Sequence, residues 1–279
     1  MLTTLSAGAI GVKVSSLDEG LAAAKLGGFP GLEFSIAQVA DMGADVAKSK
    51  FEEAGITPAV FGVPVDWRGD EAKWKEGLAA LPRLAKAAAD LGCHRTATWI
   101  MPCSNELTYT ENTAFHVERW KPIAEIMGEH GISVGLEFVG PKTIRDKFKY
   151  EFAYRADQML ELGSQIGPNV GLLLDCFHWY TSHGTVNELK SLRPHQIAYV
   201  HINDAVEGRT EDEQIDGDRR LPGATGVIDI ASFLGSLKGI GYDGPVAAEP
   251  FYPPLNELAS DEDRLRAVKE SIDAVFAKA

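Results

Sequence analysis

Residues 170–175 read VGLLLD, a run of apolar residues that ends in a carboxylate. Residues 199–202 read YVHI and are likewise dominated by side chains that favour a protein interior. A strand buried on both faces has this composition, because helices cover both sides of a parallel sheet. The two stretches therefore predict parallel strands rather than a sheet with one face in water.

Runs of this kind alternate with stretches of helical period along the whole chain. Strands are predicted at Gly8–Val14, Gly31–Ser35, Ala59–Val65, Arg95–Met101, Ile132–Phe138, Val170–Asp175, Ile197–Ile202 and Val246–Pro250. Helices are predicted at Ser16–Lys25, Val39–Ala54, Glu71–Leu91, Glu111–Glu129, Phe152–Leu162, Val186–Leu192, Asp229–Lys238 and Asp261–Lys278. Strict alternation favours right-handed crossovers between parallel strands.

We therefore expect an α/β protein with one domain over residues 1–279, folded as a single (β/α)8 TIM barrel. The length of 279 residues suits such a barrel, and 45% hydrophobic residues provide a large core. An open doubly wound sheet is the alternative. Its dinucleotide-binding form carries a glycine-rich fingerprint after the first strand, and the sequence has none there.

Charge and cysteine content narrow the partners and the compartment. The net charge of −13 disfavours nucleic acid and anionic membrane surfaces. Three scattered cysteines are too few for a disulfide framework, and no signal peptide or bilayer-spanning run is visible, so we expect a cytoplasmic protein. The sequence leaves open a homo-oligomer or a second subunit.

Side chains suited to chemistry stand near the ends of six predicted strands, where the active site of a TIM barrel lies. They are Glu33, Trp99, Glu137, Asp175, His201 and Glu249. The last four come from successive strands, which lie about 4.8 Å apart in a sheet. Three carboxylates that share one space repel one another unless a cation compensates them. The pattern predicts a metal site of Glu137, Asp175, His201 and Glu249.

The donor set indicates which metal to expect. Three carboxylates, one imidazole and no thiolate favour Mn²⁺, with Mg²⁺ or Co²⁺ as alternatives, over structural zinc. Such a shell leaves positions for two substrate oxygens.

Glu33 and the tryptophans are open to two interpretations. The tetrapeptide GLEF occurs at residues 31–34 and again at 135–138, but the first copy has no comparable partners on adjoining strands. Glu33 is therefore either a substrate contact or a surface carboxylate. Trp99 and Trp179 could stack on the apolar face of a sugar or belong to the core.

Five motifs carry a resemblance to a known family. They are GLEFVGP, LLLDCFHWY, YVHIND, RRLPGATG and AAEPF, within about residues 132–251. They resemble the sugar isomerase and epimerase barrels of the xylose-isomerase-like superfamily, especially ketose 3-epimerases, hydroxypyruvate isomerases and inosose-processing enzymes.

The resemblance implies roles for individual residues. Glu137 and Glu249 would bind the metal and also act as acid and base on opposite faces of a sugar. His178 would contact substrate, as would an arginine of the loop after the seventh strand, Arg219 or Arg220, of which we prefer Arg220. Two departures from the family pattern, at residues 138–143 and in the long acidic loop 203–226, argue against an ordinary free ketohexose.

The leading hypothesis is a divalent-metal-dependent sugar isomerase or epimerase that transfers protons through an enediolate. The alternative is a metal-dependent lyase or dehydratase acting on an inosose or a 3-oxo-glycoside, including C-glycosides. A barrel that binds sugar without turnover ranks lower, because both acid/base glutamates are present. An endonuclease IV-like role would need more histidine ligands and a surface that attracts DNA.

Overall fold

The computed structural model describes residues 1–279 and contains a closed barrel of parallel strands. Around the barrel the order is β1 (Leu2–Leu5), β10 (Pro245–Ala248), β9 (Ile197–Ile202), β8 (Val170–Asp175), β6 (Ser133–Glu137), β4 (Arg95–Trp99), β3 (Thr57–Gly62) and β2 (Gly31–Phe34). The first and last strands close the ring, with Leu2 opposite Pro245. The predicted (β/α)8 barrel is confirmed.

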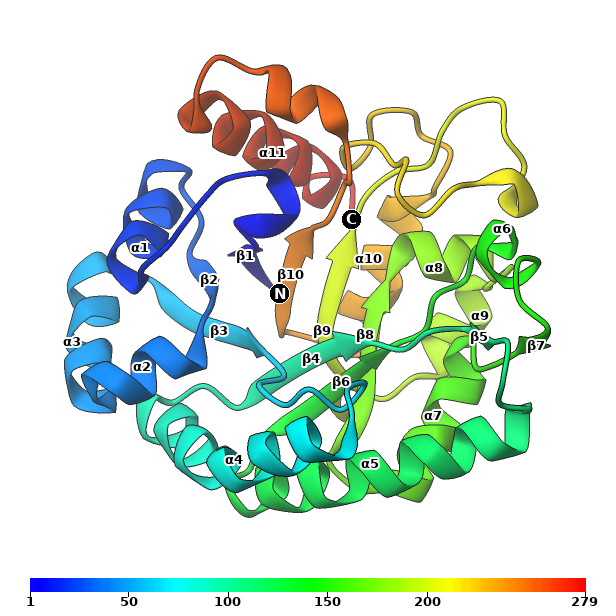
Figure 1. The fold of residues 1–279 in the computed structure, drawn as a ribbon. Helices are drawn as coiled ribbons and strands as arrows, with labels where there is room; N and C mark the ends of the chain where they lie inside the picture. Colours follow the sequence, from blue (N-terminus) through cyan, green and yellow to red (C-terminus); the bar gives the residue numbers. More distant parts are fainter.

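Helices surround the strands on all sides (Figure 1). The longer ones are α1 (Leu17–Leu26), α2 (Ile36–Met42), α3 (Ala44–Ala54), α4 (Glu71–Leu91), α5 (Tyr109–Glu129), α7 (Ala156–Ile166), α10 (Ile230–Gly239) and α11 (Asp261–Phe276). The shorter ones are α6 (Lys142–Arg145), α8 (Cys176–Thr181), α9 (Val186–Ser191) and the 3₁₀ turns η1 (Gly8–Ile10), η2 (Pro194–Gln196), η3 (Glu211–Glu213) and η4 (Pro253–Glu257). No helix combines the length and apolar character required to cross a membrane.

Two hydrophobic layers hold the barrel together. The larger layer lies between the strands and the helices, and a small one fills the barrel interior with Val60, Ala97, Leu173, Tyr199 and Ala247. Side chains alternate across a strand, so residues two positions apart share a face. The interior positions beyond Leu173, Tyr199 and Ala247 are therefore Asp175, His201 and Glu249. The packing of the barrel interior thus directs the predicted ligands toward its C-terminal mouth.

The prediction of the first strand at Gly8–Val14 is wrong. The strand is Leu2–Leu5, and residues 8–10 form the 3₁₀ turn η1. Ile10 and Val12 are buried, which made this segment look like a strand, but they belong to the loop that leaves β1. Gly11 follows the turn with φ of 76°, which interrupts an extended backbone.

Two predicted helices also differ from the observed ones. The predicted helix Val39–Ala54 is two helices, α2 and α3, because Gly43 has φ of 92° and leaves the helical region. The predicted helix Phe152–Leu162 begins only at Ala156. The residues before it form β7 (Tyr150–Glu151), which pairs antiparallel with β5 (Cys103–Ser104). Strands of two residues are too short to leave a periodic pattern in the sequence.

Gly171 allows β8 to approach the residues just before β9 closely. A Cβ at this position would lie 2.4 Å from the backbone oxygen of Gln196. Gly171→Ala should therefore push these segments apart and lower the free energy of unfolding by about 1–3 kcal/mol. The urea midpoint measures this change. Gly62→Ala is the matched control, since no atom lies within 4 Å of its added Cβ. Equal midpoints for the two variants would contradict this account.

Candidate metal centre and active site

Four side chains converge where the barrel strands end. Glu137 ends β6, Asp175 ends β8, His201 lies on β9, and Glu249 follows β10. One ligand atom from each lies within 4.8 Å of the others. His201 Nδ1 is 3.6 Å from Glu137 Oε1 and 3.5 Å from Glu249 Oε2. The structure thus brings together all four residues that the sequence predicted as metal ligands.

Asp175 is the most deeply buried carboxylate of the cluster, and several donors hold it in place. The Phe177 N–H donates at 2.6 Å, and the Asn203 side-chain amide contacts both oxygens at 3.1 and 3.2 Å. Arg219 Nη1 donates at 2.8 Å. Burial alone would raise the pKa of Asp175, but the charge of Arg219 opposes it and the pKa lies below its usual value. Asp175 is therefore a carboxylate of fixed orientation.

Glu137 and His201 have fewer hydrogen-bond partners than Asp175. Glu137 Oε1 and both ring nitrogens of His201 are buried and have no hydrogen-bond partner. Burial raises the pKa of Glu137. Burial also disfavours the imidazolium of His201, but the nearby carboxylates of Glu249 and Glu137 outweigh it and raise the pKa well above its usual value. Buried polar atoms normally have hydrogen-bond or metal partners, so these three atoms indicate that the site binds a further group.

A divalent cation fits this set of atoms. Glu137, Asp175 and Glu249 contribute three negative charges, and Arg219 shares its one positive charge with a further carboxylate, Asp216, at 2.6 Å. Three carboxylates and one imidazole are donors that divalent first-row ions and Mg²⁺ accept. The residues present therefore fit a metal ion held by Glu137, Asp175, His201 and Glu249.

Arg219, rather than Arg220, reaches this cluster. Its guanidinium is buried and lies 2.8 Å from Asp175 Oδ2 and 3.1 Å from Glu249 Oε2. The rings of Phe177 and Phe251 enclose it, with centroids 4.7 and 4.6 Å from Cζ. Arg220, preferred from the sequence, instead points away and pairs with Asp218 at 2.8 Å. The arginine of this loop that contacts the cluster is therefore Arg219 and not Arg220.

Asp204 pairs with the end of the long acidic loop and so places Arg219 at the site. Two backbone hydrogen bonds of 2.8 Å, one in each direction, join Asp204 to Arg220. Residues 205–219 therefore form a loop whose two ends lie together. The Asp204 carboxylate accepts hydrogen bonds from the backbone N–H groups of Ala205, Thr225, Gly226 and Ile228. In Figure 1 this loop lies beside α6 and α8. The insertion thus displaces Arg219 in sequence and not in space.

His178 lies beside Arg219, as expected for a residue of this mouth. Its Nε2 is 3.2 Å from Arg219 Nη2, and its Nδ1 accepts a hydrogen bond of 3.3 Å from the Gly140 N–H. A Cβ on Gly140 would lie 2.3 Å from the His178 carbonyl oxygen. Glycine at position 140 therefore allows the loop after β6 to reach the imidazole.

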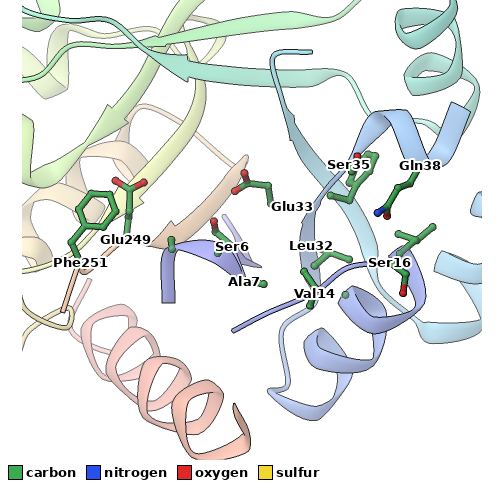
Figure 2. Close-up of a pocket in the computed structure, with 15 residues that line it drawn as sticks. Ser6, Ala7, Val14, Ser16, Leu32, Glu33, Ser35, Gln38, Glu249 and Phe251 are labelled. Atoms are coloured by element: carbon green, nitrogen blue, oxygen red, sulfur yellow. The ribbon is translucent and has the colours of Figure 1, made fainter. Parts of the chain in front are cut away.

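Glu33 lies in a cavity that also reaches Glu249. The cavity has a volume of about 470 Å³ and opens between β1, β2 and the segment after β10 (Figure 2). Tyr199, in the barrel interior, donates a hydrogen bond of 3.1 Å from its hydroxyl to Glu33 Oε2. A side chain of the core thus holds Glu33 in the cavity that Glu249 also lines, and Glu33 is not an isolated surface carboxylate.

The two tryptophans have different surroundings. Trp99 ends β4 with 45% of its surface exposed, and Arg68 lies between its ring and that of Trp67, at 4.1 and 4.2 Å from the centroids. Trp99 is opposite Glu137 in the strand register, so it lies on the rim of the mouth. Trp179 is buried and packs on Phe233, which places it in the core.

Two further residues at the site are not among those predicted from the sequence. Asn203 holds Asp175, and the signal for it in the sequence was its place in the motif YVHIND, two residues after His201. Phe251 covers Arg219 and lines the cavity, with a φ of 36° that is unusual for a residue other than glycine. The motif AAEPF contains Phe251, but no sequence pattern reveals its strained backbone.

Comparison with known proteins agrees with this architecture. The inosose isomerase of Halalkalibacterium halodurans is 27% identical over 241 residues, covering 84% of this chain and 80% of that protein. A xylose isomerase domain protein from Alicyclobacillus acidocaldarius superposes with a TM-score of 0.85 at 29% identity, covering 99% of this chain and 97% of that one. The IOLI protein, solved with a bound zinc atom, has the same fold, with a TM-score of 0.79 at 23% identity and coverage of 100% and 99%.

More distant relatives include ketose 3-epimerases. The model of one family, described as xylose isomerase-like TIM barrel, matches residues 21–277, which is most of the chain. The protein therefore belongs to the xylose isomerase-like TIM-barrel family, whose members related to it include sugar isomerases and epimerases.

Proposed function

We propose that this protein is a divalent-metal-dependent sugar isomerase or epimerase acting on a ketose, cyclitol or related polyol. The observation that carries the proposal is the buried cluster of Glu137, Asp175, His201 and Glu249, with unpartnered atoms on Glu137 and His201. The inosose isomerases and ketose 3-epimerases among its relatives support the same class of reaction.

The two glutamates are suited to proton transfer. Glu137 comes from β6 and Glu249 from the end of β10, so the two carboxylates reach the cluster from different strands. One carboxylate removes a proton from a carbon next to a carbonyl, which leaves an enediolate. The other returns a proton, either to the opposite face of that carbon, as in an epimerase, or to the adjacent carbon, as in an isomerase.

Other residues of the mouth orient the substrate and neutralise charge. Arg219 holds the carboxylates of Asp175 and Glu249 in place, and His178 lies beside it. Glu33 lines the cavity and can accept a hydrogen bond from a substrate hydroxyl. A bound divalent ion, Mn²⁺ by our expectation and held by the four ligands, supplies Lewis-acid stabilisation of negative charge. Trp99 on the rim offers an aromatic face to the sugar.

The cavity favours a second candidate function. At about 470 Å³ it matches the volumes that hold drug-sized ligands rather than a single sugar ring. The same carboxylates could abstract the proton next to a carbonyl and then expel a neighbouring group. The protein would then be a lyase or dehydratase for an inosose or a 3-oxo-glycoside.

Deuterium exchange tests the proposed proton transfer. The Mn²⁺-loaded protein should wash a proton from a carbon next to the carbonyl when ketoses, inososes and 3-oxo-glycosides are incubated in D₂O and followed by NMR. Glu249→Gln and Glu137→Gln should each slow exchange by about 10²–10⁴-fold, because a general base is lost.

The matched control for this experiment is Glu257→Gln, which changes an exposed glutamate of η4. Released aglycone or water would identify the lyase, and a rearranged sugar the isomerase or epimerase. Exchange that survives Glu249→Gln, or no exchange with any substrate despite bound metal, would contradict the proposal.

The two neighbouring arginines should differ in importance. Arg219→Lys loses the planar guanidinium that contacts Asp175 and Glu249 together, and should lower kcat/KM by roughly 10²-fold through misplaced groups. Arg220→Lys alters a partly exposed pair with Asp218, a hydrogen bond to the Arg219 carbonyl oxygen and a contact with the Tyr252 ring. None of these contacts involves a residue of the cluster, so this variant should stay near wild type. Steady-state kinetics on the substrate found by exchange measures both. A larger loss for Arg220→Lys would refute the assignment.

Metal affinity should rise with pH. The pKa values of Glu137 and His201 are both raised in the metal-free protein, so protons occupy these ligands at higher pH than usual. A metal needs the deprotonated forms, and binding must release these protons. Calorimetric titration with Mn²⁺ in buffers of different ionisation enthalpy should show proton release and weaker binding as pH falls. Affinity independent of pH would contradict this protonation pattern.

A further inference from the structure

The cavity beside Glu249 extends well beyond the metal cluster. One end holds Glu249 and Phe251, and the other end holds Val14, Ser16 and Gln38 (Figure 2). The metal ligands other than Glu249 do not line it. A substrate that reacts at Glu249 therefore has room to continue along β1 and β2 toward the start of α1 and α2.

The chemistry of this outer part suits uncharged groups. None of the fifteen lining residues is lysine, arginine or histidine, and Glu33 and Glu249 contribute carboxylates. A phosphate or carboxylate on the substrate would meet these two carboxylates and would find no cationic side chain to pair with. Ser16, Ser35 and Gln38 supply neutral hydrogen-bonding groups instead.

Apolar surface is also left exposed along the cavity. Val14 and Phe251 are among the few large hydrophobic side chains of the protein that are substantially exposed, each at 39%, and both line this space. The backbone of Phe251, at φ of 36°, is held in a region that costs free energy for a residue with a Cβ. Exposed apolar surface and local strain in one concave site are typical of ligand contact.

We infer that the part of the cavity lined by Val14, Ser16, Ser35 and Gln38 binds a second, uncharged unit of the substrate. The natural substrate is then a glycoside-like molecule with one ring at Glu249 and a neutral substituent toward α1 and α2. The inference therefore predicts no preference for a sugar phosphate. The inference rests on the proposed function for the placement of the reacting ring at Glu249.

Equilibrium binding tests this inference without turnover. D-Glucose, phenyl D-glucoside and glucose 6-phosphate are titrated into the Mn²⁺-loaded protein by calorimetry. Phenyl glucoside should bind at least tenfold more tightly than glucose, and glucose 6-phosphate no more tightly than glucose. No binding by any probe, equal affinity for glucose and its phenyl glycoside, or a preference for the phosphate would overturn the inference.

A bulky side chain in the outer part provides the matched variant. Val14→Trp should reduce the ratio of phenyl glucoside to glucose affinity at least tenfold. Val46→Trp, at an exposed valine of α3 outside the cavity, should leave the ratio unchanged. If Val14→Trp fails to fold, Gln38→Trp narrows the same space from α2. An unchanged ratio in the folded cavity variant would also overturn the inference.

The outcome is separable from that of deuterium exchange. Exchange without a preference for phenyl glucoside would remove this inference and keep the proposed function. The preference without exchange would keep the uncharged outer subsite and remove proton transfer.

Discussion

Asp175 lies entirely inside the protein, yet its surroundings keep it ionised. A buried carboxylate is costly unless charges and donors compensate it, and here the Phe177 N–H, Asn203 and Arg219 all do so. The rest of the mouth is built around this requirement. Arg219 in turn contacts Glu249 and lies beside His178, so one buried charge orders most of the polar side chains at this end of the barrel.

The negative charge of the cluster is only partly compensated by Arg219, and this leaves the site suited to bind a cation. Arg219 is divided among Asp175, Asp216 and Glu249, while Glu137 and His201 face each other with unpartnered atoms. These groups do not serve stability alone, since replacing buried charges with apolar side chains is often neutral or stabilising. Their arrangement instead suits a cation and a substrate whose charge changes during reaction.

Much of this could be predicted from local sequence, and the reason lies in the period of the strands. Leu173 and Asp175 share a face, as do Tyr199 and His201, so a core residue predicts the direction of the ligand two positions on. The barrel and the four ligands follow from such alternation. The first strand could not be predicted, because Ile10 and Val12 are as buried in a loop as they would be in a strand.

The role of Arg219 could not be predicted from the sequence, for a different reason. Its neighbour Arg220 has the same chemistry, and only the backbone pairing of Asp204 with Arg220 decides which guanidinium faces inward. That pairing closes a long loop and depends on the Asp204 carboxylate binding N–H groups about twenty residues downstream. Sequence spacing carries no signal of such a contact. The same holds for the cavity at Glu33, which is formed by three separate segments.

Anomalous X-ray diffraction from crystals grown with Mn²⁺ tests the central claim most directly. The account predicts one strong manganese peak within bonding distance of Glu137, Asp175, His201 and Glu249, and its loss in crystals of His201→Ala. A map with no peak at these residues, or manganese bound elsewhere while Arg219 alone neutralises the cluster, would contradict it.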